Sequence, residues 1–167
     1  MKIFSKNITA FILNKFFGKK KIVENLFTDK ERWLLRFINN GYFVETGWWN
    51  SFEKKAPFDS KNKPIPWLTY SAIEFLNKKL TKKLNVFEFG SGNSTLFFAE
   101  KVNTVNSVEH DDLWFSKINT NSPDNSKIYL EDINSGNYEK FLINSTDNFN
   151  IIIVDGRKRV ECVKNSI

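Results

Sequence analysis

The chain has 167 residues, of which 41% are hydrophobic and 16% aromatic, and this is enough apolar material for one domain-sized core. The single cysteine, Cys162, excludes an internal disulfide and a cysteine metal cluster, and the single histidine, His110, limits metal and triad chemistry. The net charge of +6 suits an anionic partner, but lysine is spread along the whole chain, so charge alone identifies none.

The first 21 residues have the pattern of a basic amphipathic helix. Apolar residues recur at helical spacing from Phe4 to Phe16, with lysines around them. No run reaches the roughly 20 apolar residues that a membrane-spanning helix needs, and no signal-peptide core is recognisable. We therefore expect a cytoplasmic protein whose residues 1–21 either pack on the domain or contact the inner membrane surface peripherally.

Helical patterns continue through the first half of the chain. Thr28 followed by Glu31 has the form of a capping box, and the apolar face after it stops at residues 39–41. Residues 42–66 lose this period and gather prolines and glycine, which predicts an irregular, ordered loop. A further apolar stripe then predicts a helix with Pro66 just ahead of it.

After Lys83 the pattern changes to short apolar runs separated by helical segments. The predicted strands are residues 86–89, 104–108, 128–130 and 151–154, and the predicted helices are residues 95–102, 113–118, 138–143 and one starting near Lys158. Such alternation predicts an α/β fold with a parallel sheet and helices on both faces. We divide the chain into a helical and loop segment, 1–84, and a sheet domain, 85–167.

The sequence Gly90-Ser91-Gly92 lies between the first predicted strand and its helix. A glycine turn lets the backbone approach a ligand, and the helix start offers unpaired N–H groups. Glu109 ends the next strand, about 20 residues after the motif begins, where an acidic residue binds ribose hydroxyls. A dinucleotide would fit too, but Asn93 replaces a third glycine and Glu88 suits a positively charged aminoacyl group, so S-adenosylmethionine is favoured.

Three stretches, 88–95, 107–111 and 153–157, resemble the cofactor motifs of class I (Rossmann-like) S-adenosylmethionine-dependent methyltransferases. Residues 64–70 resemble a segment of a poorly characterised bacterial subgroup. The resemblance implies a Rossmann-like sheet that normally has seven strands, of which about four are predicted. We therefore expect either a C-terminally truncated chain or a partner chain that covers the exposed edge of residues 151–154.

The resemblance also implies roles for residues of the cofactor site. Glu88 and the turn residues Gly90, Ser91 and Gly92 would hold the aminoacyl part, and Glu109 the ribose. Near the end of the third strand, Asp132 would lie by the adenine amino group, with Glu131 as the alternative because strand alternation cannot be phased from sequence.

Further residues are candidates for the acceptor side. Asp155, after the fourth strand, would lie at the methyl-transfer site as a base for an acceptor hydroxyl, or cap the following helix. Arg157 and Arg159 would bind an acceptor carboxylate or phosphate, or form solvated ion pairs. Tyr70, with nearby tryptophans, would either roof the acceptor pocket or pack in the loop.

We expect a methyltransferase that acts on a small molecule or glycan precursor. One alternative is a truncated, non-catalytic cofactor-binding module. Another is a nucleic-acid methyltransferase, which the dispersed lysines and the sequence Asp155-Gly156-Arg157, in place of a base-methylation motif, disfavour. No metal is expected, because His110 beside Asp111 is more typical of a ribose-side loop.

Overall fold

The structure is a computed structural model that describes residues 27–167, and the chain divides into two compact units with the boundary between Glu45 and Thr46. The amphipathic helix expected within residues 1–21 lies outside the described residues. Residues 46–84, which the sequence pattern grouped with the N-terminal helices, belong to the same compact unit as the sheet. Among the described helices, none is long and apolar enough to cross a bilayer.

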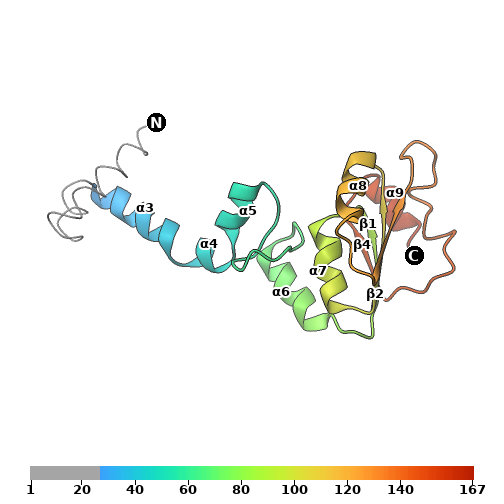
Figure 1. The fold of residues 1–167 in the computed structure, drawn as a ribbon, viewed down its shortest axis with the longest axis horizontal. Helices are drawn as coiled ribbons and strands as arrows, with labels where there is room; N and C mark the ends of the chain where they lie inside the picture. The colour runs from blue at the N-terminus through green and yellow to red at the C-terminus, as the bar shows by residue number, and fades with distance from the viewer. Residues whose placement is uncertain (1–26) are drawn as a thin grey trace. The chain divides into compact units, whose positions relative to one another are not determined.

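The described part of the first unit contains α3 (Asp29–Asn39) and α4 (Tyr42–Glu45) (Figure 1). Thr28 caps α3: its hydroxyl accepts from the backbone N–H of Glu31 at 3.3 Å, and the Glu31 carboxylate accepts from the N–H of Thr28 at 2.9 Å. The predicted capping box is therefore confirmed, and so is the predicted end of this helix.

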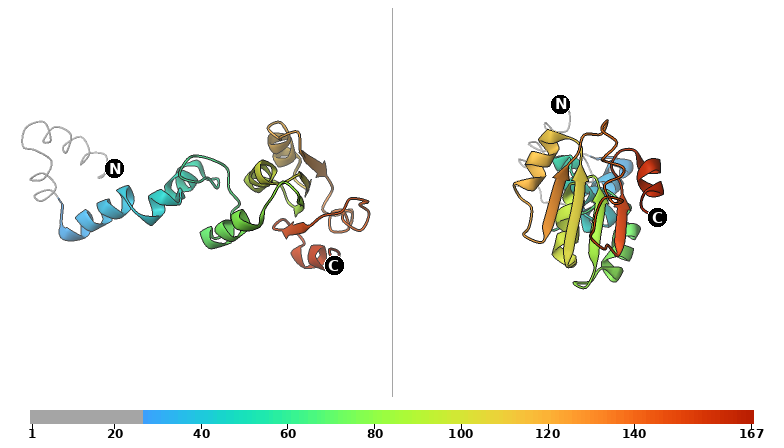
Figure 2. Two further views of the ribbon diagram at one scale, coloured as in Figure 1. Left: turned by 90° about the horizontal axis from the view of Figure 1, so that it is seen from below. Right: turned by 90° about the vertical axis from the view of Figure 1, so that its right-hand side faces the viewer.

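The second unit holds the sheet and most of the helices. Its elements are α5 (Trp48–Lys54), α6 (Tyr70–Lys79), β1 (Asn85–Phe89), α7 (Asn93–Lys101), β2 (Thr104–Glu109), α8 (Asp112–Asn119), β3 (Ser126–Leu130), β4 (Ile151–Val154) and α9 (Arg159–Lys164). The four strands are parallel and lie in the order β3-β2-β1-β4, as the right panel of Figure 2 shows. The predicted α/β, Rossmann-like arrangement is confirmed.

Strand alternation in β1 separates two apolar layers. Val86 and Glu88 face α7, whereas Phe87 and Phe89 face the opposite side of the sheet. The first layer packs β1 and β2 against α6 and α7. The second packs the sheet against α9 and the long segment between β3 and β4, which includes the fully buried Tyr138. Both faces of the sheet are therefore covered where β1 runs.

Two predictions about the helices before the sheet are wrong. The segment expected to be an irregular loop, 42–66, contains α4 and α5. The next helix does not begin directly after Pro66 but at Tyr70, because Thr69 supplies the cap: its hydroxyl accepts from the N–H of Ala72 at 3.3 Å. A side-chain acceptor at this position outweighs the tolerance of proline at a helix start.

The helix predicted at residues 138–143 is also absent, and successive turns stand in its place. The aromatic side chains of this segment lie against the sheet rather than along one helical stripe. The ring of Phe141 stacks on that of Phe87 with 5.6 Å between centroids, and the ring of Tyr138 lies 5.8 Å from that of Phe89. Burial of these rings directly on β1 replaces the covering helix.

Candidate functional site

The strand order reverses at β1, which has β2 on one side and β4 on the other. In parallel α/β sheets ligands bind at the carboxyl ends of the strands next to such a reversal. A cavity of about 580 Å³ lies at these strand ends. It is lined by Gly90, Ser91, Glu109, His110, Asp111, Leu113, Trp114, Lys117, Asp155, Gly156, Arg157 and Arg159.

The floor of this cavity is formed where the chain leaves β1 and β4. Gly90 has a φ of +95°, a conformation that strains any residue with a side chain. A Cβ atom at Gly90 would also lie 3.1 Å from the Cα atom of Gly156, just after β4. Glycine at both positions therefore lets the two strand ends approach each other and leaves backbone exposed to the cavity.

Glu109, at the end of β2, is only 4% exposed, and its carboxylate is held by the glycine turn. One oxygen accepts from the backbone N–H of Ser91 at 2.9 Å and from its hydroxyl at 3.1 Å. The other accepts from the N–H groups of His110 at 2.8 Å and Asp111 at 3.0 Å. The two features that sequence spacing linked, the glycine turn and the acidic strand end, are thus in direct contact.

Glu88 is 2% exposed and lies behind the turn rather than in the cavity lining. The hydroxyl of Ser107 donates to its carboxylate at 3.1 Å, and the hydroxyls of Ser94 and Thr95 bind it as well. Burial raises the pKa of Glu88 to about 7; these hydrogen bonds oppose the rise, and the charge of Asp155 adds to it. Glu88 therefore titrates near neutral pH inside a ring of hydroxyl groups.

Gly92 also lies outside the cavity lining. Its backbone N–H donates to the hydroxyl of Thr95 at 3.1 Å, one turn into α7. Because Thr95 also binds Glu88, the second glycine and the buried acid are parts of one polar cluster on the α7 side of the sheet. This cluster provides a hydrogen-bond partner for the backbone N–H of Gly92 at the start of α7, and it supports the glycine turn on the side away from the cavity.

The α8 wall contains residues that sequence analysis missed. The Nε1 atom of Trp114 donates to the backbone oxygen of Ser91 at 2.7 Å, and the amine of Lys117 lies 4.6 Å above the indole ring. Leu113 is highly exposed beside them. Asp111 starts this helix by accepting from the N–H of Trp114 at 2.8 Å. The signal available in sequence was the large apolar pair Leu113-Trp114, which follows the acidic strand end Glu109 after three polar residues.

The opposite wall follows β4. The guanidinium of Arg159 forms an ion pair with Asp155 at 2.9 Å and also donates to the backbone oxygens of Asp155 and Gly156. Lys158, not Asp155, occupies the N-cap position of α9. The helix-cap interpretation of Asp155 is therefore wrong, and its carboxylate instead lines the cavity beside Arg157.

Besides Glu88 and Gly92, three further candidate residues do not line this cavity. Asp132 is exposed in a turn after β3, where its carboxylate accepts from the N–H of Asn134 at 2.9 Å. Its alternative, Glu131, lines a separate polar cavity of about 520 Å³ beside β3. Tyr70 lines a third, largely apolar cavity of about 320 Å³, together with Trp67.

Within residues 27–167, no three His, Cys, Asp or Glu side chains gather as a metal site. No protein-family model matches the chain, and neither does any curated protein. The residues of the cavity are therefore the basis for assigning a function.

Proposed function

We propose that the cavity at the ends of β1, β2 and β4 binds S-adenosylmethionine and that the protein is a methyltransferase for a small molecule or glycan precursor. The contact between Glu109 and Ser91 is the observation that carries the proposal. It places a carboxylate that can accept hydrogen bonds from ribose hydroxyls beside a glycine turn, within one cavity. A volume of about 580 Å³ falls within the range of ligand pockets, about 300 to 1,000 Å³.

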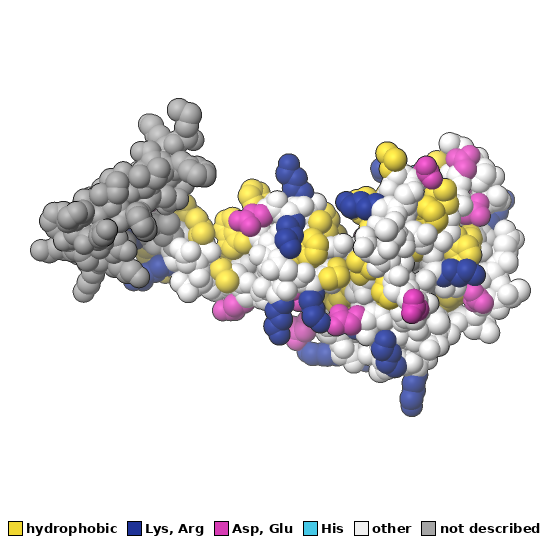
Figure 3. All heavy atoms as spheres, in the orientation of Figure 1, with side chains coloured by type: hydrophobic (Ala, Val, Ile, Leu, Met, Phe, Trp, Pro, Cys, Tyr) yellow, Lys and Arg dark blue, Asp and Glu magenta, His cyan; other side chains and the backbone are white. Residues whose placement is uncertain are grey.

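The charges of the lining favour S-adenosylmethionine over a dinucleotide. Three acidic side chains, Glu109, Asp111 and Asp155, are balanced by three basic ones on α8 and after β4. Such a lining suits a ligand with both charge signs better than a pyrophosphate, which requires an excess of donors and cations. On the face seen in Figure 3, basic side chains of the second unit are interspersed with acidic ones, which does not favour the nucleic-acid alternative.

Each wall offers a group that fits one part of the cofactor. Glu109 would accept from ribose hydroxyls, with the hydroxyl of Ser91 rotating away to leave room. The exposed backbone at Gly90 would meet the aminoacyl part. Leu113 and Trp114 would provide apolar surface for the adenine. Glu88 and Gly92 would act indirectly, by supporting the turn.

The bound cofactor would supply a methyl group that its sulfonium makes electrophilic. Asp155 is the carboxylate best placed to take the proton of an acceptor hydroxyl, because Glu109 accepts from three backbone N–H groups and is assigned to the ribose. The ion pair with Arg159 holds the Asp155 carboxylate in position at the cavity wall. Positioning of the acceptor is the main task that remains for the protein.

Calorimetry with S-adenosylhomocysteine tests the cofactor assignment. We expect the wild type to bind and Glu109→Gln to bind at least about tenfold more weakly, a loss of about 1.4 kcal/mol. The amide nitrogen of Gln would face backbone N–H donors on one side, where it cannot accept a hydrogen bond. The substitution would therefore weaken both the hydrogen bonds that hold the glycine turn and the binding of the ribose hydroxyls. Glu131→Gln, which lines another cavity, should retain wild-type affinity.

Absence of binding to the folded wild-type protein would reject the proposal, as would equal affinities of the two variants. Binding without methyl transfer to any hydroxyl or carboxyl acceptor would instead support a cofactor-binding module. Circular dichroism of each variant confirms that the comparison is made between folded proteins.

A further inference from the structure

The three consecutive cations after β4 have different environments. The amine of Lys158 binds both carboxylate oxygens of Glu139 at 3.0 Å, and Arg159 is paired with Asp155 at 2.9 Å. The guanidinium of Arg157, in contrast, has no hydrogen bond or ion pair with any residue in the range 27–167, and it lines the main cavity. Arg157 is thus the one cation of the three that is available to a ligand.

The backbone of Arg157 is nevertheless held on both sides. Its N–H points to the hydroxyl of the buried Tyr138 at 3.4 Å, and its carbonyl oxygen accepts from the thiol of Cys162 at 3.4 Å. Both partners are fully buried. The base of the side chain is therefore positioned by the core, while the charged end remains free in the cavity.

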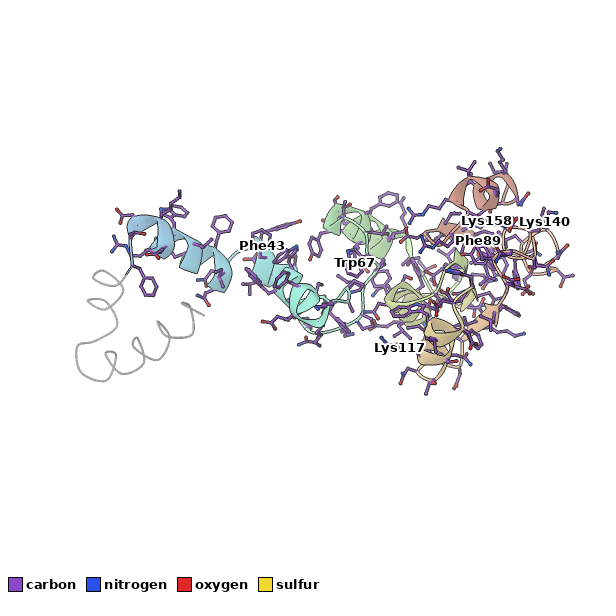
Figure 4. The ribbon with its side chains drawn as sticks, turned by 90° about the horizontal axis from the view of Figure 1, so that it is seen from above. Phe43, Trp67, Phe89, Lys117, Lys140 and Lys158 are labelled. Carbon is purple, nitrogen blue, oxygen red and sulfur yellow. The ribbon has the colours of Figure 1, made fainter. Side chains whose placement is uncertain are left out.

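A second cation stands on the facing wall. Lys117 projects from α8 and lies over the ring of Trp114, and no carboxylate of the described chain pairs with it. Lys117 and Arg157 line the same cavity, the first from α8 and the second from the loop after β4. Figure 4 labels Lys117, which lies apart from Phe89 at the end of β1. The acidic groups nearby are engaged: Asp155 by Arg159, and Glu109 by backbone N–H groups.

We infer that Arg157, assisted by Lys117, forms an anion subsite that holds a carboxylate or phosphate group of the methyl acceptor. This inference rests on the proposed function and adds the chemical class of the acceptor. A guanidinium binds either group through two parallel hydrogen bonds, which orients the ligand as well as attracting it. Asp155, two residues earlier in the same loop, would then lie beside the oriented acceptor.

The test is a titration with inorganic phosphate at constant ionic strength, with and without saturating S-adenosylhomocysteine. Phosphate binding is monitored through the amide and guanidinium signals in ¹H–¹⁵N spectra. We expect phosphate to bind the wild type in both conditions and Arg157→Gln to weaken it at least about tenfold. Affinity for S-adenosylhomocysteine should fall much less than affinity for phosphate, because Arg157 is only one of the three basic groups that line the cavity. Lys164→Gln, which removes one charge from an exposed position of α9, is the matched control and should bind phosphate like the wild type.

Equal phosphate affinity in Arg157→Gln and Lys164→Gln would overturn the inference. So would competition between phosphate and S-adenosylhomocysteine combined with loss of both ligands in Arg157→Gln, because the anion would then be the carboxylate of the cofactor itself. Phosphate binding at Arg157 in a protein that does not bind S-adenosylhomocysteine would support the anion subsite and reject the proposed function. The two failures are therefore distinguishable.

Discussion

Gly156→Ala is expected to lower the free energy of unfolding by about 3 kcal/mol. A Cβ atom at this position would overlap the hydroxyl of Tyr138 and lie 2.8 Å from the carbonyl oxygen of Phe89. Tyr138 is fully buried and Phe89 ends β1, so neither can move without disturbing the core. Urea denaturation of wild type and variant measures the difference.

Two further variants identify the cause of this loss. Gly136→Ala, where a Cβ atom would meet nothing within 4 Å, should cost only about 1 kcal/mol, from its positive φ. In a Tyr138→Phe background the closest atom is gone, so Gly156→Ala should cost at least about 1 kcal/mol less than in the wild type. A cost at Gly156 no greater than at Gly136 would contradict the packing described for the β4 end.

Glu88→Gln is expected to change the pH dependence of stability. The pKa of Glu88 is about 7 in the folded protein, compared with the ordinary value of 4.5 that applies to the unfolded chain. Between these values the folded state keeps a proton that the unfolded state releases, so raising the pH destabilises the wild type. Above about pH 7 the full penalty is present, up to about 3 kcal/mol. The variant has no such titration.

Unfolding free energies from about pH 4 to pH 8 measure this effect. The stability of Glu88→Gln relative to the wild type should rise through that range and then level off. Glu161→Gln, an exposed position on α9, should instead follow the wild-type curve. Parallel curves for Glu88→Gln and the wild type would mean that the carboxylate is not desolvated in the ring of Ser94, Thr95 and Ser107.

The sheet was predictable because each strand is a short apolar run with polar turn residues at its ends. The four predicted strands are present, with small differences at their ends, and the capping box at Thr28 fixed the start of α3. The sequence does not determine the conformation of the segment 138–143, because its aromatic spacing suits both a helix and direct packing on Phe87 and Phe89. Only the tertiary contact decides between these two conformations.

For the candidate site, the sequence predicts the local motifs but not the directions in which their side chains point. The glycine turn and Glu109 were predicted together, and they are in contact. The orientation of Glu88 toward α7 depends on the strand register, which sequence alone does not give. Among the described residues, Arg159 is paired and Arg157 is not, because the Asp155 carboxylate points toward Arg159. The position of Trp114 in the cavity wall depends on its hydrogen bond to Ser91, which is 23 residues earlier in the sequence.

The central claim is that S-adenosylmethionine binds at the ends of β1, β2 and β4. The most direct measurement is a titration of the ¹⁵N-labelled protein with S-adenosylhomocysteine, followed through assigned backbone amide signals. Saturable shifts are expected at Ser91, His110 and Arg157, with little change at Asn134 or at Ser51, which lines another cavity. Unchanged signals at the first three residues, or shifts confined to the last two, would contradict it.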